Sequence, residues 1–188
     1  MEGLSMNIKK GISYVAFGFL FTLVNFNLTI NSVSICVTPD FIGWLLFFLA
    51  FDKLGTYISD KSYMKWIALV MMIITGALWL GGIVKPELDM DILKTIVTVC
   101  SCVYFFILFG VLEKIADDYH SAQKSTLGFL KYFNILISLG FVVTALIGGM
   151  MQSELILGLS AVIGIVALVA AIVTAVVLFK LRKELNAA

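Results

Sequence analysis

The chain has 188 residues, of which 61% are hydrophobic and 13% are charged, and its formal net charge is +1. Soluble domains carry about 45–50% apolar and about 25% charged residues, so a water-soluble fold of this size could not hide so much apolar surface. A net charge this close to zero gives no sign of a nucleic-acid partner. The composition predicts an integral membrane protein whose first partner is the lipid bilayer.

The first apolar run covers residues 11–26 and follows Lys9 and Lys10. Basic residues before an apolar run also mark signal peptides, but those end in a small-x-small cleavage site. The residues from Val24 to Asn27 do not form such a site. We therefore expect residues 11–26 to form an uncleaved first membrane helix.

Residues 27–37 differ from the helix before them. They read Asn-Leu-Thr-Ile, then Asn31-Ser32, then Val-Ser-Ile-Cys-Val. Alternation of polar and apolar residues around a turn is typical of a β-hairpin, which would lie on the extracytoplasmic side. One face of this hairpin must be buried, so we expect it to cover the outer mouth of the bundle as a lid. Continuation of the first helix is the alternative.

Thr38, Pro39 and Asp40 predict the start of a second helix over residues 39–54. Thr can cap a helix, Pro suits its first position, and Asp is stabilised at the positive end of the helix dipole. With Gly43 and Trp44 they form the candidate outer-face site, a functional or structural cap in which Asp40 fixes the lid. A direct ligand contact by Asp40 is the alternative. The helix would be only about 24 Å long, so a re-entrant half-helix competes with a crossing one.

Four longer segments follow, predicted over residues 66–84, 95–112, 129–149 and 155–179. Each covers most or all of a charge-free run of 18 to 25 residues, the third of which begins just after Lys131; a crossing helix needs about 20 apolar residues. The predicted fold class is therefore all-α: a six-transmembrane-helix bundle that forms a single integral membrane domain over residues 1–188.

Small residues recur every four positions on the last two predicted helices, and small residues let membrane helices approach closely. We expect these two faces to pack against each other, with a contact between two copies of the chain as the alternative. The residues of the two faces are Gly140, Thr144 and Gly148, and Ala167, Ala171 and Ala175.

Basic residues predict the orientation of the chain in the membrane. If residues 39–54 cross, eleven basic residues lie on one side and only Lys85 and Lys94 on the other. The positive-inside rule assigns the richer side to the cytoplasm. This predicts a multi-pass protein of the cell membrane with both termini cytoplasmic. It also places Trp44 and Trp79 at the outer membrane interface.

The sequence shows no residues arranged for catalysis, cofactor binding or metal binding, so we expect no enzyme and no cofactor. Membrane enzymes and ion-coupled transporters place ionisable residues inside the bilayer, and none is expected here at mid-depth. Hydrogen bonding between helices is the expected role of the embedded polar residues, with a neutral-solute site as the alternative. These residues are Thr22, Asn25, Thr75, Thr98, Ser101, Asn134, Ser138, Thr144, Ser160 and Thr174.

The run Pro39-Asp40-Phe41-Ile42-Gly43-Trp44 resembles uncharacterised small polytopic membrane proteins of Firmicutes, which carry a Pro-Asp-Phe-Ile-Gly-aromatic stretch at the second span. The likeness covers roughly residues 25–55. It departs from that pattern where Trp44 replaces a more usual Tyr and where Val37-Thr38 precedes the proline. The resemblance implies a bacterial cytoplasmic-membrane location and no particular activity.

Two functions follow as hypotheses. The leading one is a non-enzymatic accessory, scaffold or regulatory component of the cytoplasmic membrane, whose partner is another membrane protein or a second copy of the chain. The alternative is a small-solute binding or transport protein, such as the substrate-capture subunit of a transporter.

The charge asymmetry gives a prediction about topology. Single cysteines at positions 61, 124 and 183 should be labelled only from the cytoplasmic side, and those at 85 and 152 only from outside, because basic loops stay in the cytoplasm. Labelling with a membrane-impermeant maleimide in intact and permeabilised cells measures this. An externally labelled position 61 would contradict a crossing by residues 39–54.

Overall fold

The computed structural model of the chain describes residues 2–23, 27–30, 33–36, 39–58, 62–84, 91–150 and 154–185. It contains six α-helices in this part, and each predicted span overlaps one of them. The helices are α1 (Glu2–Leu23), α2 (Asp40–Leu54), α3 (Tyr63–Val84), α4 (Asp91–Asp118), α5 (Lys124–Met150) and α6 (Glu154–Glu184).

Four of these helices are long and apolar enough to cross a membrane, namely α3, α4, α5 and α6. The finding supports a helical multi-pass membrane protein. Helix α2 has only 15 residues, while α1 includes Lys9 and Lys10 within its 22 residues. Length and hydropathy alone therefore do not make α1 and α2 crossing helices.

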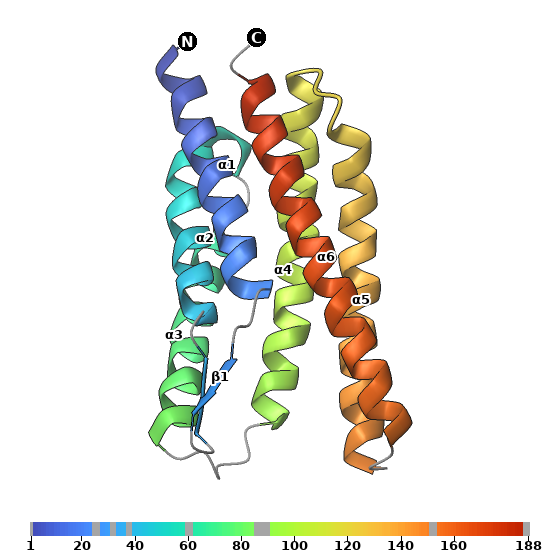
Figure 1. Cartoon of the computed structure of the whole chain (residues 1–188). Helices are drawn as coiled ribbons and strands as arrows, with labels where there is room; N and C mark the ends of the chain where they lie inside the picture. Colours follow the sequence, from blue (N-terminus) through green and yellow to red (C-terminus); the bar gives the residue numbers. More distant parts are fainter. Residues whose placement is uncertain are drawn as a thin grey trace.

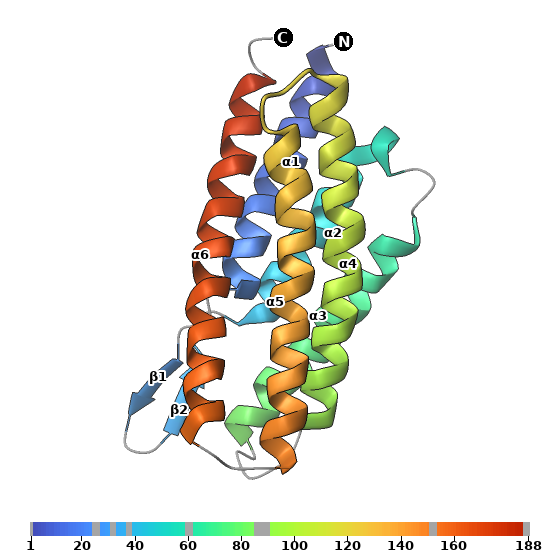
Figure 2. The same ribbon diagram turned by 90° about the vertical axis from the view of Figure 1, so that its right-hand side faces the viewer.

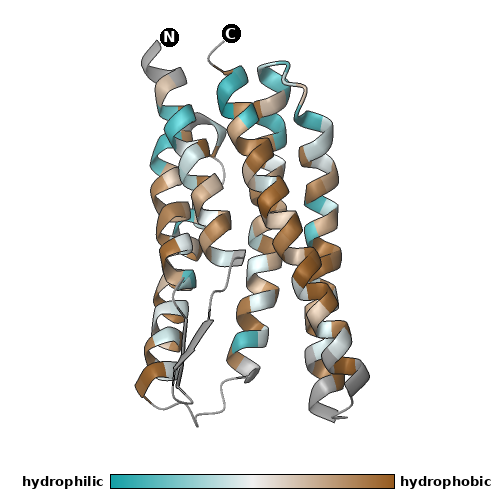
Figure 3. Cartoon of the chain, viewed as in Figure 1, coloured by the Kyte–Doolittle hydropathy of each residue, from teal (hydrophilic) through white to brown (hydrophobic). Residues whose placement is uncertain are grey.

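The helices run side by side, and the start of α1 lies at the same end of the bundle as the end of α6 (Figures 1 and 2). Around the bundle, α1 packs on α2 and α6, α2 also packs on α3, and α5 packs on α4 and α6. Hydrophilic residues gather at the end that carries both termini, and the rest of the helix surface is mostly apolar (Figure 3). This is the distribution that a bilayer around the apolar part favours.

Glycines bring α1 and α2 into close antiparallel contact. A Cβ atom at Gly18 of α1 would lie 2.6 Å from the Phe47 ring of α2, and one at Gly11 would lie 2.8 Å from Leu54. Gly43 of α2 is tighter still, because its Cβ would lie 2.4 Å from the Thr22 methyl carbon and 2.7 Å from the Gly18 carbonyl oxygen. Small residues permit such packing between membrane helices, and the tightest pair by this measure is α1–α2.

Aromatic rings fill the space between α1, α2 and α4. The Phe19 ring of α1 lies 4.9 Å from Phe105 and 5.2 Å from Phe109 on α4. On α2, Trp44 stacks on Phe105 with an interplanar angle of 7°. All of these side chains are buried, so they form a core that fixes α4 against the α1–α2 pair.

The predicted α5–α6 contact exists, with a different pairing of residues from the one expected. A Cβ at Gly140 would lie 3.2 Å from Ile163, while Ala167 is buried in a cluster with Ile137 and Ala170. The small residues of one helix thus lie opposite larger residues of the other. Ala171, Ala175 and Thr144 are all buried; the surroundings of Gly148 lie outside the described part of the structure.

Two short strands, β1 (Asn27–Ile30) and β2 (Val33–Cys36), pair in antiparallel register with Asn27 opposite Cys36 and Ile30 opposite Val33. They lie beside α3 at the end of the bundle opposite the termini (Figures 1 and 2). The intervening residues 31 and 32, residue 37 and all strand side chains are outside the described part. A hairpin acting as a lid therefore stays a prediction.

The contact at Gly43 gives a stability prediction. Gly43→Ala should lower the free energy of unfolding by about 1–3 kcal/mol, because the new methyl group overlaps the Gly18 backbone, which cannot move aside as a side chain can. Thermal or denaturant unfolding in detergent measures the change. Gly82→Ala on α3 is the matched control, since nothing lies within 4 Å of its Cβ position. If both variants were as stable as the parent, α1 and α2 would have to lie further apart than they do in this structure.

Candidate functional site

Helix α2 begins inside the bundle rather than at its outer end. Its 15 residues span about 22 Å, whereas the 28 residues of α4 span about 42 Å. The last residues of α1 and the first residues of α2 lie well short of the far end of the bundle, which α3 to α6 reach (Figure 1). The first residue of α2, Asp40, therefore lies at a depth where its neighbouring helices continue.

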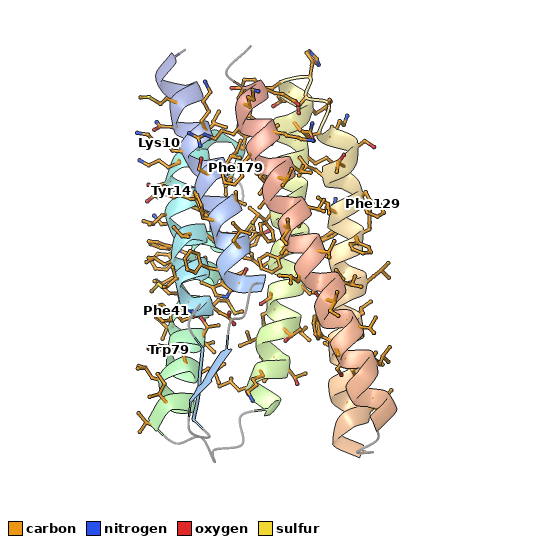
Figure 4. The ribbon with its side chains drawn as sticks, in the orientation of Figure 1. Lys10, Tyr14, Phe41, Trp79, Phe129 and Phe179 are labelled. Atoms are coloured by element: carbon orange, nitrogen blue, oxygen red, sulfur yellow. The ribbon has the colours of Figure 1, made fainter. Side chains whose placement is uncertain are left out.

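Two contacts set this depth. Phe41 lies against Gly76 of α3, because a Cβ atom added at Gly76 would lie 3.7 Å from the Cβ of Phe41. From Gly76, α3 continues for eight more residues, about 12 Å, to Val84. Phe41 and Trp79 also meet edge to face at 5.6 Å, away from the terminal end (Figure 4). In the other direction, Asp52 marks the charged end of α2, about 18 Å from Asp40 along the helix. Helix α2 therefore starts partway along α3, with about 12 Å of α3 beyond this point on one side and about 18 Å of α2 on the other.

Asp40 belongs to the inward face of α2. Trp44 follows it one turn later on the same face, and Trp44, Phe47 and Phe51 on this stripe are all buried. The Oδ1 atom of Asp40 is buried and accepts no hydrogen bond from the described residues, although the residue as a whole is only partly buried. The stripe thus begins with a carboxyl group that has an unsatisfied acceptor and some access from the outer side.

Tyr104 of α4 is the second unsatisfied polar group. Its side chain is only 1% exposed, and its hydroxyl has no hydrogen-bond partner among the described residues. Its ring lies 4.9 Å from Trp44, 5.7 Å from Phe47 and 6.4 Å from Phe51. Of these three side chains, Trp44 is therefore the closest to Tyr104, and Trp44 lies one helical turn after Asp40.

Two expectations from the sequence concern this helix start. Trp44 was expected at the outer interface; its side chain is 2% exposed and packs in the core, because the inward face of α2 carries it toward α4. Ionisable residues were expected only near the ends of spans, and Asp40 is the first residue of α2. That helix end lies inside the bundle because α2 is short.

The other residues of the predicted cap support the start of α2. Pro39 is its N-cap residue, with φ −71° and ψ 129° and no side-chain cap hydrogen bond; Thr38, the expected cap, lies outside the described residues. Asp40 is the acidic residue of the first turn, where the helix dipole favours a negative charge. Gly43 makes the contact with α1 described above, so Pro39 and Gly43 shape the position that Asp40 occupies.

The embedded polar residues do not bond as expected. Seven of them donate a hydrogen bond to the backbone carbonyl four residues earlier in their own helix, so these donors are not used between helices. Hydroxyl donors often bond this way when no other partner is near. The seven are Thr22, Thr75, Thr98, Ser101, Asn134, Thr144 and Thr174.

At the end that carries the termini, by contrast, several charged groups have partners. Lys65 pairs with Asp52 at 2.6 Å and Lys124 with Asp117 at 2.8 Å. Glu184 at the end of α6 accepts hydrogen bonds from Ser121 and Gln123 in the α4–α5 connection. These contacts give each of the polar groups named here a protein partner.

Tyr57, in the short 3₁₀ turn Gly55–Tyr57 after α2, contributes to the same polar end. Burial, and then the charge of Asp118 at the end of α4, raise the pKa of Tyr57 to about 12, and side-chain hydrogen bonds with Asp118 and Tyr119 act in the same direction. The phenol therefore stays neutral at physiological pH and joins the α2–α3 connection to α4.

Among the described residues, no three His, Cys, Asp or Glu side chains lie close enough together to hold a metal ion. Cys100 and Cys102 are free thiols. Comparisons with protein-family models, with curated proteins and with solved structures give no match. Asp40, Tyr104 and the aromatic rings near them are the candidate functional residues.

The unpaired hydroxyl of Tyr104 gives a prediction. Tyr104→Phe should keep or raise the stability of the unliganded protein, by up to about 1 kcal/mol, because a buried hydroxyl without a partner carries a desolvation cost. Thermal unfolding in detergent measures it. Tyr132→Phe on α5, where the side chain is 61% exposed, is the control and should change nothing. A loss of stability in Tyr104→Phe alone would mean that the hydroxyl has a partner.

Proposed function

We propose that the chain is a non-enzymatic, small-solute-binding protein of the cytoplasmic membrane with six crossing segments and both termini in the cytoplasm. Its binding site lies in the outer half of the bundle, where α2 begins at Asp40. The observation that carries the proposal is the buried Oδ1 atom of Asp40, which lacks a partner among the described residues.

Physical cost supports this proposal. A buried polar atom without a hydrogen bond is destabilising, and a buried charge more so, so an intramembrane carboxyl group is by default a candidate for function. Backbone that is not helical at membrane depth is tolerated only where protein or a water-filled space surrounds it. At the proposed site the backbone becomes helical only at Asp40, beside longer helices that continue past it (Figure 1).

The antiparallel packing of α1 and α2 supports the orientation and the number of crossings. Together with the strands between them, these two helices reach from the terminal end toward the opposite end and back. Residues 53 to 65 are then on the same side as both termini, as the eleven-to-two distribution of basic residues favours.

The accessory or scaffold role stays the competing prediction. Such a protein acts through its outer surface and its helix contacts, and it has no use for a carboxyl group that is unsatisfied inside the bundle. The two roles therefore differ in whether the purified protein binds a small molecule.

A ligand-dependent thermal shift tests the proposed function. Full-length protein in detergent should be stabilised by at least one member of a vitamin and metabolite panel, since a ligand at about 100 times its Kd adds about 2.7 kcal/mol to the folded state. The same ligand should not shift Asp40→Leu, which fills the position without an acceptor. A panel without any hit would favour the accessory role.

A further inference from the structure

We infer that the solute bound at Asp40 is a small organic cation, an amine in its ammonium form. This inference rests on the proposed function and names the chemical class of its ligand. It follows from which groups the site offers and which groups it lacks.

The site offers a negative charge but few oxygen ligands. Asp40 supplies one carboxyl group and Tyr104 one phenol oxygen, whereas calcium takes six to eight oxygen ligands and magnesium an octahedral set. No cluster of acidic, His or Cys side chains lies nearby among the described residues. A metal ion would have too few ligands here. An ammonium group needs only one carboxylate as its counter-charge and partners for its polarised N–H or C–H groups.

The side chains around the start of α2 are aromatic, and Trp44 and Tyr104 are buried against each other. Trp44 is one turn away on the same face, Tyr104 lies 4.9 Å from it, and Phe41 next in sequence meets Trp79 at 5.6 Å. Aromatic faces attract cations through their quadrupoles, most strongly Trp, and cages of such rings recognise ammonium groups. Anions are disfavoured by Asp40, and neutral solutes gain nothing from its charge.

The direction of Tyr104 brings its hydroxyl toward the same place. Long side chains on a helix point toward the N-terminus of that helix, and α4 starts at the end of the bundle away from the termini (Figure 1). The Tyr104 side chain therefore leans outward along the bundle, toward the level of Asp40. That agrees with its ring being nearer to Trp44 than to Phe47 or Phe51. The phenol oxygen and the carboxyl oxygen are the two acceptors that ammonium N–H groups would satisfy.

The test compares two matched pairs of probes by isothermal titration calorimetry on the full-length protein in detergent. Choline is paired with 3,3-dimethylbutan-1-ol, in which carbon replaces the nitrogen, and benzylammonium is paired with benzyl alcohol. We expect at least one cation to bind at least tenfold more tightly than its neutral partner. Equal binding within both pairs would overturn the inference but leave the proposed solute site intact.

Variants then locate the binding. Asp40→Asn keeps the shape of the side chain and removes its charge, so it should weaken cation binding at least tenfold. Asp52→Asn on the same helix is the control, because the carboxylate of Asp52 pairs with Lys65 at the terminal end and should not affect the ligand. Parent-like cation binding by Asp40→Asn would also overturn the inference.

A second variant tests the geometry without altering the charge. Tyr104→Phe, expected to fold as stably as the parent, should weaken benzylammonium more than choline, because only the primary ammonium has N–H groups to donate. If neither cation binds the parent, the inference fails outright. The vitamin and metabolite panel then decides separately whether the proposed solute site survives.

Discussion

The close contact between α1 and α2 sets the position of the start of α2 and of the side chains around it. Gly43 lies against the backbone of Gly18, so α2 cannot slide along α1 without placing a larger residue at that point. The register fixed there determines where α2 begins, and hence the depth of Asp40. It also turns Trp44 and Phe47 toward α4, where Phe105 and Tyr104 complete the core.

This arrangement joins two environments with opposite electrostatic demands. At the terminal end, charged groups lie near water and are matched by partners such as Asp52 with Lys65; exposed pairs of this kind contribute little stability but tolerate their charges easily. Asp40 has neither water on all sides nor a described partner for Oδ1. A buried acceptor without a partner carries a desolvation cost, so packing alone does not explain this side chain.

Hydropathy in the sequence was enough to find the helices, because a run of apolar residues without charges has few stable arrangements other than a membrane helix. The sequence also indicated that a helix starts beside Pro39. It could not give the depth of that start, which depends on the contact between Gly43 and Gly18, residues 25 apart in the chain. Nor could it give the burial of Trp44, because a Trp near a helix end suits the membrane interface and the sequence does not show whether that end lies inside the bundle.

The polar residues of the bundle show why the site is confined to so small a region. Thr75, Thr144 and Thr174 direct their hydroxyl donors to their own helix backbones, so these hydroxyls have no free donor for a solute. Asp40 and Tyr104 have no such bond to lose among the described residues. A ligand with donor groups gains most where acceptors are already desolvated and unpaired. In the proposed site, this unsatisfied pair is therefore what would concentrate binding at the start of α2.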